Sequence, residues 1–277
     1  MINKLTIFLF FIGVFGNLSA QEIGRLRSSF YSSKQLDESE LQVIYDVTFV
    51  KNPKYLDYKT SSLALLSIGN IFSKFSDINQ VKRDSLSQVY SDMGFVGGKE
   101  LRELTKYPII WDRVVLLDRE EQKVRVQKRM FDNYEYEEVL PKFSWKLEED
   151  TIRILNYQCK KATTTFAGRN YTAWYTTSIP ISLGPYLFHG LPGLILRIAD
   201  SENHYVFEAV GISKKKEPIK WTIGNNWKKI TVKEFASIER SIHENPGFYV
   251  KGKAMDENGN PIVPKFSPKP YNPIERD

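Results

Sequence analysis

The residues that could do chemistry in this sequence are few and lie far apart. The chain has three histidines, His189, His204 and His243, and one cysteine, Cys159. No histidine has a partner at a short metal-binding spacing such as H-E-x-x-H, so the sequence predicts no metal site and no cofactor. Cys159 would be a nucleophile only with a histidine beside it in space. Its position at a strand start favours a small buried side chain instead.

Other catalytic signatures are missing. The nucleophile elbow G-x-S-x-G and the phosphate-binding patterns G-x-x-x-x-G-K-[ST] and G-x-G-x-x-G do not occur. The acidic runs Glu148–Asp150 and Asp256–Glu257 stand in a turn and in the C-terminal tail, and adjacency there does not give the carboxylate arrangement of a glycosidase. The sequence therefore favours a protein that is not an enzyme, and it leaves a hydrolase of unrecognised type open.

One stretch carries an excess of positive charge. Seven lysines lie between Ser213 and Lys233 against the single acid Glu217. Candidate contacts with an anionic surface, such as lipid headgroups or acidic glycans, are Lys214, Lys215, Lys216, Trp221 and Trp227. The alternative, which we favour slightly, is a solvated set of lysines that protects an edge strand from unwanted pairing.

Length and composition describe an ordinary globular chain. Its 277 residues are 42% hydrophobic, 26% charged and 13% aromatic, and 39 basic residues stand against 33 acidic ones. This mild excess gives no indication of a nucleic-acid partner. A single cysteine also excludes an intrachain disulfide and a four-cysteine zinc site. The fold must therefore depend on its hydrophobic core.

The first twenty residues have the three parts of an export signal. Lys4 precedes the apolar run Leu5–Phe15, and Ala20 is followed by the polar Gln21. The run is too short to cross a bilayer as a helix, and no cysteine follows it for lipid attachment. We expect a cleavable signal peptide at residues 1–20 and a mature protein in the periplasm or at the cell surface, neither a lipoprotein nor a transmembrane protein.

Alternating apolar and polar residues predict strands along most of the chain. Leu41–Phe49 has the period of a strand with one buried face, and Ile109–Leu117 with Lys123–Met130 indicates a hairpin. Beyond Pro141 the strand patterns are Phe143–Leu147, Thr151–Leu155, Tyr157–Phe166, Tyr171–Ser178, Leu194–Ala199 and Tyr205–Ile212. Strands at such short intervals predict a meandering antiparallel sheet, because parallel pairing needs longer crossovers.

Two helices and a tail complete the prediction. Asp77–Met93 has apolar residues at helical spacing after a cap at Ser76 or Asp77, and Thr231–Glu234 is a capping box that opens a second helix. The fold class is mainly β (α+β), a strongly curved antiparallel sheet or half-barrel with one or two covering helices. Residues 21–250 form a single β-rich domain, and the proline-rich residues 251–277 form an extended tail.

The stretch Tyr157–Ile195 contains several short motifs. Tyr157–Thr163, Gly168-Arg169, Ala173-Trp174-Tyr175 and Ile179-Pro180-Ile181 precede Gly190-Leu191-Pro192-Gly193-Leu194-Ile195. In their order, and in the complete last motif, they resemble the GLPGLI family of exported bacterial proteins. The resemblance covers about Val43 to Ile212 and implies an exported, β-rich protein, but it assigns no reaction and no catalytic residues.

The loop before the motif has two interpretations. Cys159–Phe166 and Asn170–Ser178 predict a hairpin whose turn contains Gly168, and prolines and glycines then keep Ile179–Pro192 out of a regular ladder. A stiff loop of this kind could form a pocket or a docking surface, with Arg169, Trp174, Pro180, Gly184, Pro185, His189, Gly190, Leu191, Pro192 and Gly193 as candidates. The alternative, which we favour, is a structural corner. Similarly, we expect Arg169 to pair with a neighbouring carboxylate rather than with a partner's anion.

These patterns give three functional hypotheses. The first is non-catalytic binding of an apolar ligand or of an envelope protein, because the strands are rich in aromatic residues and catalytic motifs are missing. The second is a hydrolase of unrecognised type that acts on envelope polymers. The third is an accessory subunit of an outer-membrane assembly. No partner is identified beyond a possible envelope protein or lipid.

Overall fold

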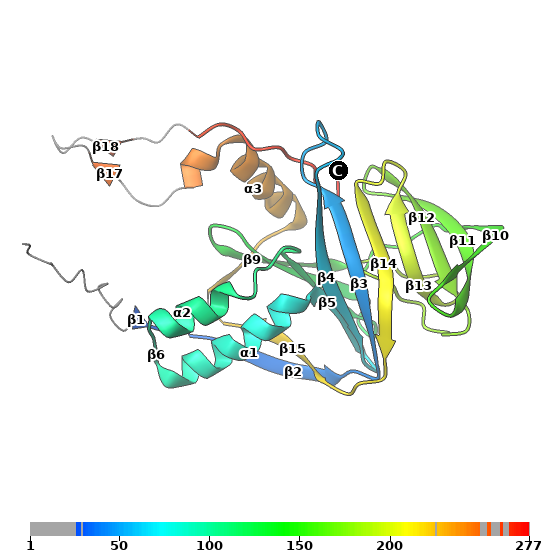
Figure 1. Cartoon of the computed structure of the whole chain (residues 1–277), viewed down its shortest axis with the longest axis horizontal. Helices are drawn as coiled ribbons and strands as arrows, with labels where there is room; N and C mark the ends of the chain where they lie inside the picture. Colours follow the sequence, from blue (N-terminus) through cyan, green and yellow to red (C-terminus); the bar gives the residue numbers. More distant parts are fainter. Residues whose placement is uncertain are drawn as a thin grey trace, which may run out of the picture.

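A sheet of 12 strands forms the centre of the structure (Figure 1). The structure is a computed structural model and describes residues 26–28, 30–224, 226–249, 254–255, 261–262 and 266–276. In order across the sheet the strands are β10 (Lys146–Ile154), β11 (Tyr157–Phe166), β12 (Arg169–Thr176), β13 (Leu194–Asp200), β14 (Tyr205–Ser213), β3 (Leu41–Val50), β4 (Lys59–Ile68), β5 (Phe72–Asp77), β7 (Arg113–Asp118), β8 (Lys123–Arg129), β9 (Asn133–Val139) and β16 (Trp227–Lys229). The sheet is open, and β10 and β16 are its edges.

Smaller elements surround this sheet. Three two-stranded pairs are β1 (Leu26–Arg27) with β6 (Phe95–Val96), β2 (Ser32–Glu38) with β15 (Pro218–Ile223), and β17 (Ala254–Met255) with β18 (Pro261–Ile262). The helices are α1 (Ile78–Met93), α2 (Gly98–Thr105), α3 (Val232–Glu244) and the short 3-10 helix η1 (Pro246–Tyr249). In Figure 1 the three α-helices lie to one side of the central strands, and β10, β11 and β12 lie on the other.

The prediction of a mainly β fold with a large antiparallel sheet is confirmed, with three differences. β16 pairs parallel with β9. A third helix, α2, is present; its eight residues are too few for a helical period to show. Ser32–Glu38, for which the sequence predicts no element, forms β2, which is paired with β15 far along the chain. Long-range pairing of this kind leaves no trace in a local pattern.

The predicted caps are present. Asp77 caps α1, and its Oδ1 accepts a hydrogen bond of 2.8 Å from the backbone N–H of Asn79. At α3 the capping box is complete, because Thr231 Oγ1 accepts from Glu234 N at 3.2 Å and Glu234 Oε2 accepts from Thr231 N at 2.8 Å. In the β11–β12 turn Gly168 has a φ of 71°, the conformation for which glycine was expected there.

The loop between β12 and β13 fills the core rather than a surface. Buried side chains of this loop are Leu183, Tyr186, Leu187, Phe188 and Leu191. The ring of Phe188 lies 4.7 Å from that of Tyr171, 5.5 Å from that of Phe143 and 6.4 Å from that of Phe207, measured between centroids. The loop therefore packs against the strands from several sides.

Gly193 ends this loop where two backbones nearly touch. A Cβ atom built at Gly193 would lie 2.1 Å from the carbonyl oxygen of Thr176, far inside van der Waals contact. Only glycine, which has no Cβ atom, fits there.

The two ends of the chain are the predicted signal peptide and the predicted extended tail. The signal peptide predicted at residues 1–20 lies outside the described residues. Residues 266–276 are extended, but they pack against the sheet and α3, and Ile274 is buried. We call residues 269–276 the C-terminal strap. Among the described residues, no helix has the length and apolar character needed to cross a bilayer.

Candidate functional site

The sheet register places two cations side by side on the inner face. Arg113 of β7 and Lys128 of β8 are direct cross-strand partners, and both side chains are largely buried. Like charges in this position repel each other unless an anion lies between them. Glu239 of α3 supplies that anion: its Oε2 accepts from Arg113 Nη2 at 2.7 Å and its Oε1 from Lys128 Nζ at 2.6 Å. The three residues fix the helix to the sheet.

The charge state of this cluster follows from its contacts. Burial alone would raise the pKa of the Glu239 carboxyl, but the charges of Arg113 and Lys128 outweigh it and lower the pKa from 4.5 to about 2. Burial acts against the charge of Arg113 as well, yet Glu239 raises the pKa of that guanidinium well above its ordinary value. Glu239 and Arg113 therefore stay ionised at neutral pH.

A second carboxylate, Asp112, lies at the water-facing side of the cluster. Lys128 Nζ is 3.0 Å from Asp112 Oδ2 and 2.6 Å from Glu239 Oε1, so these two oxygens lie within about 5.6 Å of each other. The Asp112 side chain is 52% exposed, whereas that of Glu239 is 7% exposed. Asp112 is therefore the carboxylate that solvent and a ligand can reach.

The segment that carries Asp112 is held by the N-cap of α1. Asp77 Oδ2 accepts hydrogen bonds of 3.0 Å from the backbone N–H groups of Ile110 and Trp111. The same oxygen accepts from Ser62 Oγ at 2.6 Å. One buried carboxylate thus positions the start of β7 and, with it, both Asp112 and the adjoining Arg113.

These charges line a pocket between β7, β8, α3 and the strap, which we call the α3 pocket. Its volume is about 420 Å³, within the range of small-molecule sites. Aromatic walls come from Phe49, Trp111, Tyr205 and Tyr271, and the charged and polar lining comes from Lys51, Asp112, Arg113, Lys128, Glu239, His243, Lys269 and Asn272. The pocket combines apolar ring faces with several hydrogen-bonding groups.

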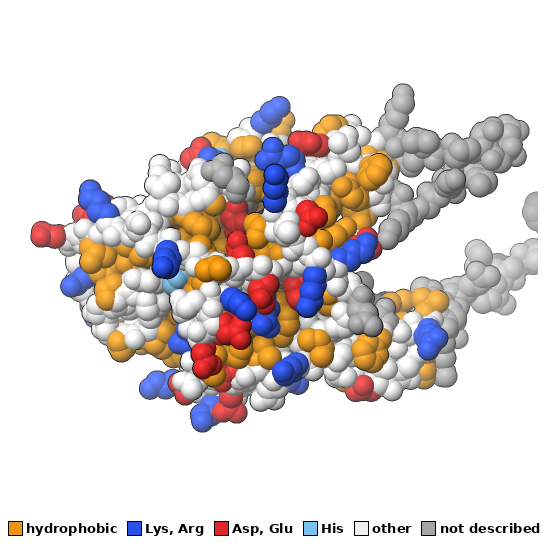
Figure 2. Space-filling view, turned by 180° about the vertical axis from the view of Figure 1, so that it is seen from behind, with side chains coloured by type: hydrophobic (Ala, Val, Ile, Leu, Met, Phe, Trp, Pro, Cys, Tyr) orange, Lys and Arg blue, Asp and Glu red, His pale blue; other side chains and the backbone are white. Residues whose placement is uncertain are grey.

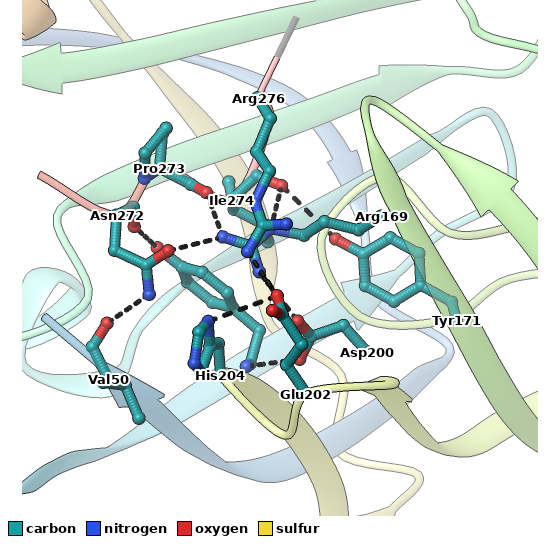
Figure 3. A network of polar contacts seen from close by, with 11 residues as sticks. Val50, Arg169, Tyr171, Asp200, Glu202, His204, Asn272, Pro273, Ile274 and Arg276 are labelled. Atoms are coloured by element: carbon teal, nitrogen blue, oxygen red, sulfur yellow. Dashed lines mark hydrogen bonds and ion pairs between the residues drawn. The ribbon is translucent and has the colours of Figure 1, made fainter. Parts of the chain in front are cut away.

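The strap forms one wall of the pocket and is anchored by Arg169 (Figure 3). This guanidinium is buried and donates to Asp200 Oδ2 at 2.7 Å, to the Pro273 carbonyl at 2.6 Å and to the Ile274 carbonyl at 3.1 Å. Arg169 therefore pairs with a neighbouring carboxylate, as we expected, and also holds the strap through backbone carbonyls.

Asp200, Glu202 and His204 could form a metal site by geometry, because one ligand atom of each lies within 4.8 Å of the others. Both carboxylates already have cationic partners, however. Asp200 binds Arg169, and Glu202 pairs with Arg276 of the strap (Figure 3). Since these arginines neutralise the acids, we assign the group to strap anchoring.

Tyr186 connects the core loop to the pocket. Its hydroxyl accepts a hydrogen bond of 3.0 Å from Arg113 Nη1 and donates to Glu275 of the strap. The loop between β12 and β13 therefore contacts Arg113 of the pocket through this buried hydroxyl.

The other loop candidates lie apart from the pocket. Leu191, Gly184, Pro185 and Gly193 are buried, Trp174 and His189 are half-buried, and Pro180, Gly190 and Pro192 are exposed. His189 Nδ1 lies 2.8 Å from the Leu187 carbonyl, and burial lowers the pKa of its imidazole. It is a hydrogen-bonded loop residue, as the structural interpretation expects. Cys159 is fully buried, and burial raises the pKa of its thiol.

Of the candidate contacts with an anionic surface, the structure contradicts Trp221 and leaves the three lysines exposed. Trp221 is 4% exposed and packs with Leu116 and Ile219, and its Nε1 donates to Glu135 at 3.1 Å, so its ring cannot enter a membrane interface. Trp227 is half-buried beneath Arg129. The three lysines, Lys214, Lys215 and Lys216, are exposed, and two of them have acidic neighbours. On the face shown in Figure 2, acidic and basic side chains are interspersed.

Comparisons with known proteins bear on the function. Residues 118–234 match a family model described as the N-terminal domain of an N-glycanase peptide, PNGase F-II. Two solved structures of PNGF-II, in different crystal forms, are 15% identical to this chain, with TM-scores of 0.48 and 0.47. Each covers 73% of this chain, which spans about a third of their length, 33% and 32%. No curated protein matches the sequence.

The family-model match corrects the first functional hypothesis. We expected non-catalytic binding of an apolar ligand or of an envelope protein, but the matched model describes part of a glycan-releasing enzyme. The match therefore favours the alternative of a hydrolase. Within the matched residues lie Lys128 and Tyr186 of the site, whereas Arg113 and Glu239 lie just outside them.

Sequence reasoning missed the residues of the α3 pocket, although two indications were present. Arg113 stands in the same alternating register as Val115 and Leu117, so a charge occupies a core-facing position of a strand. Glu239 stands four residues after Phe235 on the apolar side of a helix. Each is a buried charge that needs a partner of opposite sign, but the sequence does not show that the partners are each other.

Proposed function

We propose that the protein is an N-glycanase-like hydrolase, which cleaves the bond between a glycan and an asparagine side chain. The observation that carries the proposal is the match of residues 118–234 to the N-glycanase family model. The α3 pocket supports it, because aromatic walls and a set of hydrogen-bonding groups suit a sugar, whose ring has apolar faces and hydroxyl edges.

The lining of the pocket also fits amide hydrolysis. Asp112 is placed to take a proton from an attacking water, since it is the exposed carboxylate beside the cationic cluster. Lys128 and Arg113 are placed to stabilise the negative charge that develops on the carbonyl oxygen. The carbon–nitrogen bond then breaks, the proton passes to the leaving nitrogen on the sugar, and the asparagine becomes aspartate. Glu239 is a weak base at a pKa of about 2, so its role is to position the two cations.

Incubation of the full chain with an N-glycosylated peptide tests the proposal. Mass spectrometry should detect the released glycan, which leaves as its glycosylamine, and a peptide in which asparagine has become aspartate. Asp112→Asn should lower the rate by about 10²-fold to 10⁴-fold, the usual contribution of a general base. Asp150→Asn is the matched control, because Asp150 is an exposed aspartate 3.3 Å from Lys161 and lies outside the pocket. Absence of glycan release by the unmodified protein, or an unchanged rate for Asp112→Asn, would overturn the proposal.

Export is part of the same proposal. The pattern of residues 1–20 and the complete motif Gly190–Ile195 support an exported protein related to the GLPGLI family. N-terminal sequencing of the protein recovered from a periplasmic or surface fraction should begin at Gln21, and a sequence that begins at Met1 would contradict export by cleavage.

A further inference from the structure

The loop that joins β3 and β4 exposes three large apolar side chains within four residues. Tyr55 is 59% exposed, Leu56 is 53% exposed and Tyr58 is 78% exposed. The two tyrosine rings meet edge to face with centroids 6.1 Å apart. Single exposed apolar side chains are common in soluble proteins, but a group of them on one loop indicates a binding surface. We call residues 52–58 the tyrosine loop.

The tyrosine loop is held in place by its own hydrogen bonds. The backbone N–H of Tyr55 donates to the Asn52 carbonyl at 2.9 Å, and that of Tyr58 donates to the Tyr55 carbonyl at 3.2 Å. The Asn52 side chain accepts a further bond of 3.0 Å from Lys54 N. Two successive turns therefore present the rings in a fixed arrangement, which reduces the entropy lost when a ligand binds.

The loop begins at the rim of the α3 pocket. Phe49 and Lys51, at the end of β3, line the pocket, and Tyr55 follows Lys51 by four residues. The Cα atoms of Lys51 and Tyr55 can therefore lie at most roughly 14 Å apart. The strap reaches the same place, because Asn272 Nδ2 donates to the Val50 carbonyl at 2.7 Å. In Figure 1 the loop between β3 and β4 and the C-terminal end of the chain lie side by side.

We propose that the tyrosine loop is an outer subsite that stacks on sugar rings beyond those held in the α3 pocket. This inference rests on the proposed function and makes it more specific: the substrate is an extended glycan rather than a single sugar on asparagine. The rings offer flat apolar faces to the C–H faces of a sugar, and the tyrosine hydroxyls and the Lys51 and Lys54 amines can bond its hydroxyl groups. The continuity of the loop with the pocket favours a glycan over a separate peptide segment.

The test compares three ligands in the Asp112→Asn background, in which turnover is slowed by the factor given above. The ligands are a glycopeptide with a full-length branched glycan, the same peptide with only the first two sugars, and the peptide without sugar, with affinities measured by calorimetry. The double variant Tyr55→Ala/Tyr58→Ala should lose roughly tenfold in affinity for the full-length glycan, from about 0.7 kcal/mol for each ring. Affinity for the two-sugar peptide should stay within twofold.

The matched control is Phe30→Ala. Phe30 is 75% exposed, comparable with Tyr58, and stands before β2 on a different part of the chain. It should leave all affinities unchanged. Unchanged affinity of the double variant for the full-length glycan would overturn the subsite while leaving the proposed function intact. An equal loss for the peptide without sugar would mean that the loop contacts polypeptide, which also overturns the subsite. If the protein with intact tyrosines binds neither glycopeptide, the proposed function fails and the subsite with it.

Discussion

Replacing Glu239 by glutamine tests whether one carboxylate holds the α3 pocket together. Gln is close to Glu in size, so the change removes the charge and little else. It leaves Arg113 and Lys128 adjacent on the sheet face without the anion that separates them. Removal of one partner from a buried ion pair usually costs about 3–5 kcal/mol.

The pKa of Glu239 gives an independent magnitude and a pH dependence. The pKa is about 2 in the folded protein and 4.5 as its ordinary value, so ionised Glu239 stabilises the fold by about 3 kcal/mol at pH 7. Because the pKa is lowered by folding, this stabilisation is fully present above pH 4.5 and is lost as the pH falls toward 2. At pH 3 less than half of it remains. The unmodified protein and Glu239→Gln should therefore converge in stability as the solution is acidified.

Urea unfolding at pH 7, 5, 4 and 3 measures the difference between the two proteins. Glu208→Gln is the control, because Glu208 also accepts from an arginine, Arg197 Nε at 3.0 Å, but is 51% exposed. Exposed pairs contribute little, so this change should cost less than about 1 kcal/mol at every pH. The reasoning is refuted if the loss for Glu239→Gln at pH 7 matches that of the control, or if it stays constant down to pH 3.

Three further predictions concern other parts of the structure. Arg169→Met should destabilise the fold by about 3–5 kcal/mol and release the strap, so limited proteolysis should remove the C-terminal residues first; a strap that stays resistant would contradict its anchoring role. Cys159 should react with a thiol reagent at pH 8 only as fast as the protein unfolds, because burial raises the pKa of its thiol, and rapid labelling of the native protein would contradict this. Gly193→Ala should prevent correct folding, because the added Cβ would meet the carbonyl oxygen of Thr176. Its control is Gly98→Ala, which has only a flexible side chain 3.4 Å away and should keep a melting temperature near that of the unmodified protein.

Local chemistry made part of the fold predictable. The alternation in Leu41–Phe49 and the capping box at Thr231 each depend on residues within a few positions of one another, and both elements are where the sequence places them. Gly168 was also identifiable, since a tight turn restricts the choice of residue at a single position.

Contacts between residues far apart in the sequence determine the features of the fold and the site that local patterns did not predict. Trp221 beside lysines has the composition of a membrane-facing segment, yet β2 and Leu116 cover it from other parts of the chain. The pair of Arg113 and Glu239 joins positions 126 residues apart. A charge at a core-facing position shows locally that some partner must exist, but only the packing of α3 on β7 and β8 shows which one.

The same topology determines how much of the chain the α3 pocket requires. The family-model match begins at the end of β7 and runs into α3, so it includes β8–β9 from one half of the sheet and β10–β14 from the other. These halves are joined by β3, β4, β5 and β7, of which only the last residue of β7 lies inside the match. Residues 118–234 alone would therefore have no continuous sheet between their two groups of strands, and they would lack Arg113, Glu239 and the strap. Activity at the α3 pocket should accordingly belong to the chain with its N-terminal strands and its strap, and a fragment limited to the matched residues should fail to bind any glycopeptide.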